Sequence, residues 1–208
     1  MYTVHNKKGE PNDTMVCCFL IHTVCSVNAL SAGSSRVLYS RVFGPEDNPE
    51  TDPERRRLLQ KERLLHLARR VRTAVGLCHD AAGSACVECV LGEEAVALGE
   101  AEFGVLRLSA GEPFPVERTV LWLGVQNLAF SLVCDVHENL LLAEGTLRNL
   151  ARHCMEELRL LGPGSEILLK SDRIDALLHR YLPHGQLLFL NHRFTHLLDK
   201  ELSAYGSK

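Results

Sequence analysis

The middle of the 208-residue chain constrains the fold more than any other part of the sequence. Two apolar runs rich in β-branched and aromatic residues, 118–125 and 128–134, are separated only by Gln126 and Asn127. Two such runs joined by two polar residues predict an antiparallel hairpin. The hairpin contains no pattern typical of an active site, so we expect a scaffold that presents surfaces to partners.

A polar turn, 135–139, connects this hairpin to the leucine-rich run that begins at Leu140. Asp135, His137 and Glu138 cluster there, next to a predicted helix start. Side chains of this kind at a helix start usually satisfy free backbone N–H groups. We therefore interpret the cluster as a cap and not as an acid–base site.

Apolar periodicity predicts the remaining elements. The run 15–23 is apolar except for His22 and Thr23 at its end, which indicates a strand buried on both faces of a sheet. The residues 51–54, Thr-Asp-Pro-Glu, form a helix start that offers the Thr51 hydroxyl or the Asp52 carboxylate as the cap. Apolar residues then recur at helical spacing as far as Cys78. Further strands are predicted at 36–43 and 103–109, a surface loop at 79–102, and further helices at 140–161 and 172–182.

Composition favours one domain. The chain is 46% hydrophobic and 24% charged, which suits a single core. We expect a domain over 15–202, a disordered leader over 1–14 and a polar tail over 203–208. No apolar run reaches the roughly 18 residues that a membrane span requires.

The charge pattern does not indicate a nucleic-acid-binding protein. The net charge is −3, and lysine and arginine are spread along the chain. One local excess of arginine, over 55–72, is interleaved with glutamate and leucine. A solvated helix face explains this excess better than a phosphate-binding surface.

Eight cysteines leave one alternative function open. Cys86 and Cys89 have C-x-x-C spacing, and Cys78 with His79 lies upstream, so these four residues could form a zinc or redox site. The irregular spacing between the two halves favours an ordinary surface loop instead. The cysteines in predicted strands and helices, at 17, 18, 134 and 154, are expected to be reduced and buried.

The order of elements resembles the longin-like α+β fold, a five-stranded, largely antiparallel sheet with helices on both faces. The first strand, Met15–His22, resembles that of the sigma (small) subunits of heterotetrameric adaptor complexes, as does Cys134–Glu144. Within that family, the sigma subunits of the fifth adaptor complex are the most similar. The strings that carry this resemblance include 19–23, 36–40, 120–125, 137–148 and 180–191.

The resemblance implies a non-catalytic subunit with no cofactor. It implies packing against a large zeta chain, in a tetramer completed by beta and mu subunits, with spatacsin and spastizin as accessory proteins. It also implies endosomal sorting at late endosomes and lysosomes, from the cytoplasmic side and with membrane association only through the complex. Another longin-type platform, binding a small GTPase or a SNARE, is the alternative.

Two sets of residues are candidates for partner contacts. Arg36 and Leu128 fall at positions similar to a basic and an apolar contributor to the acidic dileucine pocket of related sigma subunits, although plain surface and core roles would also account for them. The C-terminal region carries more apolar surface than a small sheet needs, which predicts a subunit interface or, alternatively, a self-contained core helix. Its residues are Leu187, Leu188, Phe189, Leu190, Phe194, Leu197 and Leu198.

Overall fold

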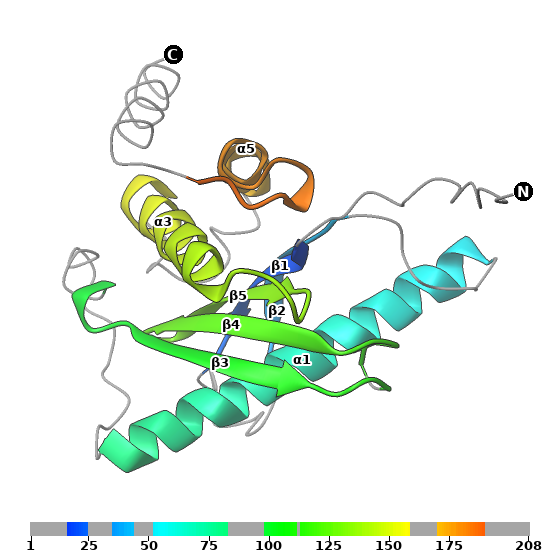
Figure 1. Cartoon of the computed structure of the whole chain (residues 1–208), viewed down its shortest axis with the longest axis horizontal. Coiled ribbons are helices and arrows are strands. Elements are labelled where there is room, and N and C mark those ends of the chain that lie inside the picture. The colour runs from blue at the N-terminus through cyan, green and yellow to red at the C-terminus, as the bar shows by residue number, and fades with distance from the viewer. Residues whose placement is uncertain are drawn as a thin grey trace, which may run out of the picture.

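The computed structural model of the chain describes residues 16–24, 35–43, 52–82, 98–111, 113–158 and 170–189. The predicted leader and tail lie outside these residues, as do Cys86 and Cys89. Within them, five strands form one sheet, with helices on both of its faces (Figure 1). The elements are β1 (Val16–Thr23), β2 (Val37–Val42), α1 (Pro53–Ala82), β3 (Glu102–Leu108), β4 (Arg118–Val125), β5 (Leu128–Cys134), α3 (Leu140–Leu158), α5 (Ser171–Tyr181) and the short 3₁₀ turn η2 (Pro183–Gly185).

The sheet has the strand order β2-β1-β5-β4-β3, and every neighbouring pair is antiparallel. The predicted hairpin is confirmed, because β4 and β5 pair up to Val125 and Leu128 across the two-residue turn. The first strand is confirmed as an interior strand that pairs with β2 on one side and β5 on the other. The fold is therefore the expected longin-like α+β arrangement.

Alternate residues of the central strands build two separate cores. On one face, Leu20 and Trp122 pack with α1 residues such as Val71. On the other face, Phe19 and Phe130 pack with residues of α3 and α5. Because side chains alternate along a strand, the continuous apolar runs of β1, β4 and β5 supply both cores at once.

A glycine makes room for the largest buried side chain. Trp122 is 2% exposed, and its cross-strand partner on β3 is Gly104. A Cβ atom at Gly104 would overlap the indole ring of Trp122. Trp122 therefore packs in the core, and its position depends on a partner without a side chain.

Helix α1 begins as predicted, since the Asp52 carboxylate accepts a hydrogen bond from the Glu54 backbone N–H at 3.1 Å. It runs to Ala82, so the prediction that a loop starts at residue 79 was wrong. Cys78 was expected on the buried face but is exposed. The buried residues of α1 end at Val75. Cys78 lies on the same side of the helix as Val71 and Val75, so at Cys78 the helix has passed beyond its contact with the sheet.

The turn after α5 depends on Gly185. It has φ of +81°, and a Cβ atom there would lie 2.7 Å from the Val16 carbonyl oxygen and 2.8 Å from Cβ of Phe43. Gly185 therefore lets η2 approach the start of β1 and the end of β2, a contact that fixes the C-terminal segment against the sheet.

We predict that Gly185→Ala lowers the free energy of unfolding by about 2 kcal/mol or more, from backbone strain and the clash with main-chain atoms. The matched control is Gly145→Ala in α3, where no atom lies within 4 Å of the added Cβ. That change should stabilise the chain by up to about 1 kcal/mol, because alanine favours helix. Urea unfolding monitored by circular dichroism measures both, and equal stability of the two variants would contradict the role of Gly185.

Candidate functional site

The polar turn between β5 and α3 is a cap, as the sequence predicted. The Asp135 carboxylate accepts hydrogen bonds from the His137 backbone N–H at 3.2 Å and from the Arg118 guanidinium at 3.1 Å. The Asn139 side-chain oxygen accepts from the Leu142 backbone N–H at 3.1 Å and so caps α3. Each of these side-chain oxygens accepts a hydrogen bond that shapes the turn. This structural role explains the polar cluster.

The described cysteines show no sign of a metal or redox centre. Across the ranges that the structure describes, no three histidine, cysteine or acidic residues lie close enough to hold a metal ion. Burial raises the pKa of Cys18 well above its ordinary value, and burial followed by the nearby Glu138 raises the pKa of Cys134. These thiols stay protonated and therefore unreactive.

The proposed four-residue zinc or redox set is only partly visible. Cys78 is exposed on α1, and His79 is the next residue of that helix. Cys86 and Cys89 lie outside the described residues. The hypothesis for this set therefore stays untested.

His22 is a fully buried histidine near the end of the interior strand β1. Its Nδ1 lies 3.3 Å from the Thr23 carbonyl oxygen, to which it can only donate, and its Nε2 lies 3.1 Å from the Ser131 hydroxyl. With Nδ1 protonated, Nε2 accepts from Ser131 and the ring is neutral. Burial lowers the pKa of His22 to about 4, and the hydrogen bond to Thr23 offsets only part of that effect.

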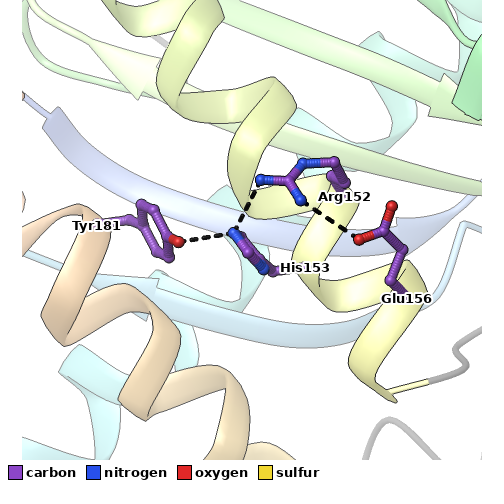
Figure 2. A network of polar contacts seen from close by, with 4 residues as sticks. All are labelled: Arg152, His153, Glu156 and Tyr181. Carbon is purple, nitrogen blue, oxygen red and sulfur yellow. Dashed lines mark hydrogen bonds and ion pairs between the residues drawn. The ribbon is translucent and has the colours of Figure 1, made fainter. Parts of the chain in front are cut away.

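A polar network that the sequence did not reveal joins α3 to α5 (Figure 2). The buried Tyr181 hydroxyl lies 2.6 Å from Nε2 of His153, and the two rings stack with centroids 4.8 Å apart. Arg152 also approaches that nitrogen, at 3.2 Å, and pairs with Glu156 at 3.4 Å. Because a guanidinium only donates, Nε2 acts as the acceptor in this contact. The network fixes the position of α5 on α3.

A second polar contact ties α5 to the edge strand β2. The Tyr39 hydroxyl donates to the Asp175 carboxylate at 2.6 Å, and Arg41 lies 3.5 Å from the same oxygen. Burial, and then the hydrogen bond to Asp175, raise the pKa of Tyr39. Tyr39 and Asp175 are 136 residues apart, so neither periodicity nor spacing could have predicted this pair.

The residues predicted for a subunit interface have different environments. Leu187 is 8% exposed and belongs to the core beneath α3 and α5, which favours the alternative core role for it. Leu188 is half-buried, whereas Phe189 is 85% exposed. The remaining predicted residues, Leu190, Phe194, Leu197 and Leu198, lie outside the described part of the chain.

The two residues suggested for a sorting signal lie at the same end of the sheet. Thr23 on β1 donates its backbone N–H to the Arg36 carbonyl at 2.9 Å, and its Cα partner on the other side is Leu128. Arg36 is exposed, but Leu128 is 6% exposed and packs in the core. The structure brings the two residues near one another, and the burial of Leu128 favours its core role.

Membrane insertion finds no support among the described helices. None of them combines the length and the hydropathy that crossing a bilayer requires.

We predict that His22 makes stability depend on pH. Its pKa is about 4 in the folded state, against about 6.5 for an unperturbed histidine, so the unfolded state binds more protons between these values. The stability that depends on the neutral His22 ring is fully present above about pH 6.5. It is lost as the pH falls toward about 4. Relative to His22→Gln, the wild type should lose about 2 kcal/mol between pH 7.5 and about 5, measured by urea unfolding.

The exposed His137 provides the control, because its ring stays in water in both states. His137→Gln should keep the wild-type dependence on pH. If the difference in the free energy of unfolding between wild type and His22→Gln stays constant across this pH range, the prediction of a buried, neutral His22 is wrong.

Comparison with known proteins gives a consistent result. A family model described as AP-5 complex subunit sigma-1 matches residues 15–203. AP-5 complex subunit sigma-1 of Homo sapiens is 51% identical over 197 residues, covering 91% of this chain and 98% of the human protein. The protein of the same name from Mus musculus is 50% identical over 156 residues, covering 72% of this chain and 91% of the mouse protein. The chain therefore belongs to the AP-5 complex subunit sigma-1 family, whose members are non-enzymatic small subunits of an adaptor complex.

Proposed function

We propose that this chain is the small subunit of a heterotetrameric adaptor complex and that it packs against a large zeta-type subunit, with beta and mu subunits completing the assembly. The observation that carries the proposal is the 51% identity to human AP-5 complex subunit sigma-1 across 98% of that protein. An identity of this size over nearly the whole of the human protein supports a shared fold and a shared mode of assembly. A protein that functions by assembly needs its surface as much as its core.

The described surface offers apolar side chains for such an assembly. Phe189 and Leu141 are the two most exposed large apolar residues of the described chain, at 85% and 81%. Single exposed leucines are common, but an exposed phenylalanine in a segment that also holds half-buried Leu188 is a better anchor. We propose that this segment, 188–189, contributes to the contact with the zeta-type subunit.

The cellular role follows from the complex. We propose that the chain acts in endosomal sorting at late endosomes and lysosomes, from the cytoplasmic side, and reaches the membrane only through the assembled complex. Accessory proteins of the spatacsin and spastizin type are the expected partners of that complex. The family relationship supports these proposals.

Recognition of a sorting signal is a narrower proposal. Arg36 is exposed at the end of the sheet and could pair with an acidic residue of a signal peptide. Leu128 would have to contribute from a position that is almost fully buried. Arg36 is therefore the stronger of the two candidates.

Affinity purification of the tagged full chain, with identification of the bound chains, tests the assembly. We expect zeta-type, beta and mu subunits to co-purify, and we expect the chain expressed alone to be poorly soluble or unstable. Recovery of a stable monomer that binds no zeta-type chain would refute the proposal. Recovery of a small GTPase or a SNARE in place of adaptor subunits would favour another longin-type platform.

The variant Phe189→Asp tests the proposed contact. It should weaken binding of the zeta-type subunit about 30-fold, because a charge would replace an anchor worth about 2 kcal/mol. The control is Val116→Asp, which places the same charge at a side chain that is 45% exposed on the β3–β4 connection. Similar recovery of the zeta-type subunit with both variants would show that Phe189 is not a contact.

A further inference from the structure

Helix α5 is held on α3 by a directional contact at its C-terminal end. The buried side of α5 includes Ile174, Leu177 and Leu178, but apolar packing has no preferred direction and does not by itself fix the rotation of the helix. At the last residue of α5, the Tyr181 hydroxyl lies 2.6 Å from Nε2 of His153 (Figure 2). A hydrogen bond depends on angle as well as distance, so this contact sets the orientation of the end of α5.

The His153 ring is itself held in place. His153 is buried, and Arg152 donates to the same Nε2 at 3.2 Å while it pairs with Glu156 at 3.4 Å. Nε2 is therefore an acceptor, so the Tyr181 hydroxyl is the donor. The rings of His153 and Tyr181 also stack, with their planes 28° apart. The hydrogen bond and the stacking together restrain Tyr181, and with it the last turn of α5.

A tight turn connects this restrained end of α5 to the segment 188–189, which is proposed to contact the zeta-type subunit. The turn is η2, and the Gly185 backbone N–H donates to the Leu182 carbonyl at 3.1 Å. Pro183 has a φ fixed by its ring, whereas His184 and Gly185 have left-handed φ values of 52° and 81°. A turn with so little conformational freedom passes the orientation of α5 on to the residues that follow.

Leu187 anchors the chain just before the contact segment. It is buried in the same core cluster as Tyr181 and Leu182. Leu188 is half-buried and Phe189 is exposed. Phe189 therefore projects from a backbone whose position depends on how α5 and the core beneath it are arranged.

We propose that the Tyr181 hydroxyl and His153 are positioning groups for partner binding, because they hold the segment 188–189 where the zeta-type subunit meets it. This inference rests on the proposed function and identifies what keeps its contact segment in place. A segment that is ordered before binding gives a higher affinity, since less conformational entropy is lost when the complex forms. Both positioning groups are buried, so they act through the chain and not by touching the partner.

The variant Tyr181→Phe tests the proposal, because it removes one hydroxyl and keeps a ring that can stack in the core. The matched control is Tyr39→Phe, which removes a hydroxyl that donates at the same distance, 2.6 Å, to Asp175 toward the start of α5. We expect Tyr181→Phe to weaken binding of the zeta-type subunit about fivefold and Tyr39→Phe less than about twofold. Dilution of the co-purified complex measures both affinities.

Both tyrosine variants should lower the midpoint of thermal unfolding, by about 2–4 °C each, because each loses one hydrogen bond. The effect on binding therefore separates positioning from plain stabilisation. An equal loss of binding with Tyr39→Phe and Tyr181→Phe would overturn the proposal, since any weakening of α5 would then have the same effect.

Two variants of His153 separate its acceptor atom from the bulk of its ring. A glutamine side chain can place its carbonyl oxygen near the position of Nε2, whereas asparagine is too short to do so. His153→Asn should weaken binding of the zeta-type subunit at least about fivefold, because it removes the acceptor for the Tyr181 hydroxyl. His153→Gln should weaken it less, and equal losses with the two variants would contradict the role of the acceptor.

A double variant tests whether Tyr181 acts through Phe189. Adding Tyr181→Phe to Phe189→Asp should weaken binding less than about twofold beyond Phe189→Asp alone, because the anchor to be positioned is already lost. Fully additive losses would overturn the proposal, since Tyr181 would then affect the interface by another route.

Hydrogen exchange measured by mass spectrometry tests the positioning directly. In the full chain, purified with the subunits that it binds, Tyr181→Phe should speed amide exchange of the peptide 182–189 at least about threefold, and Tyr39→Phe less than about twofold. Unchanged exchange with Tyr181→Phe, while adaptor subunits co-purify, would count against this inference alone. The expected change in exchange, in a wild-type chain that recovers no adaptor subunit, would support the positioning and count against the proposed function.

Discussion

The structure depends on the pairing of β1 with β5 at the centre of the sheet. Seven pairs of residues, from Val16–Cys134 to Thr23–Leu128, define the register of these two strands. The pairing connects a strand near the start of the chain to one in its middle. Each strand places alternate side chains on opposite faces, so this one pairing supplies apolar residues to the core under α1 and to the core under α3 and α5. The helices can cover both faces because these central strands are apolar along most of their length.

Polar residues between the strands and helices hold these elements in position. His22 bridges β1 and β5 as a neutral ring, and the Tyr181–His153 pair orients α5 on α3. Tyr39 and Asp175 then hold α5 against the edge strand. A protein that functions by assembly needs such orientation, because its partners must meet a surface of constant shape.

Local patterns in the sequence predicted most of the fold, because hairpins and helix starts depend on neighbouring residues. Gln126 and Asn127 marked the hairpin, and Asp52 with Pro53 marked the start of α1. The end of α1 was misplaced because the helix continues past the sheet, where no buried face remains to reveal its period. Leu187 lies in the core although its apolar segment was predicted as an interface, since apolar character alone does not distinguish a core from a partner surface.

The sequence by itself determined the order of elements, the strands buried on both faces and the resemblance to adaptor small subunits, because each of these is written in residues that are adjacent or regularly spaced. Only the tertiary structure decided which polar groups meet, as with Tyr39 and Asp175, because contacts between distant segments leave no local period. The exposure of a helix face is set by what packs beside it, and on α1 the sheet buries the face that carries Leu67, Val71 and Val75.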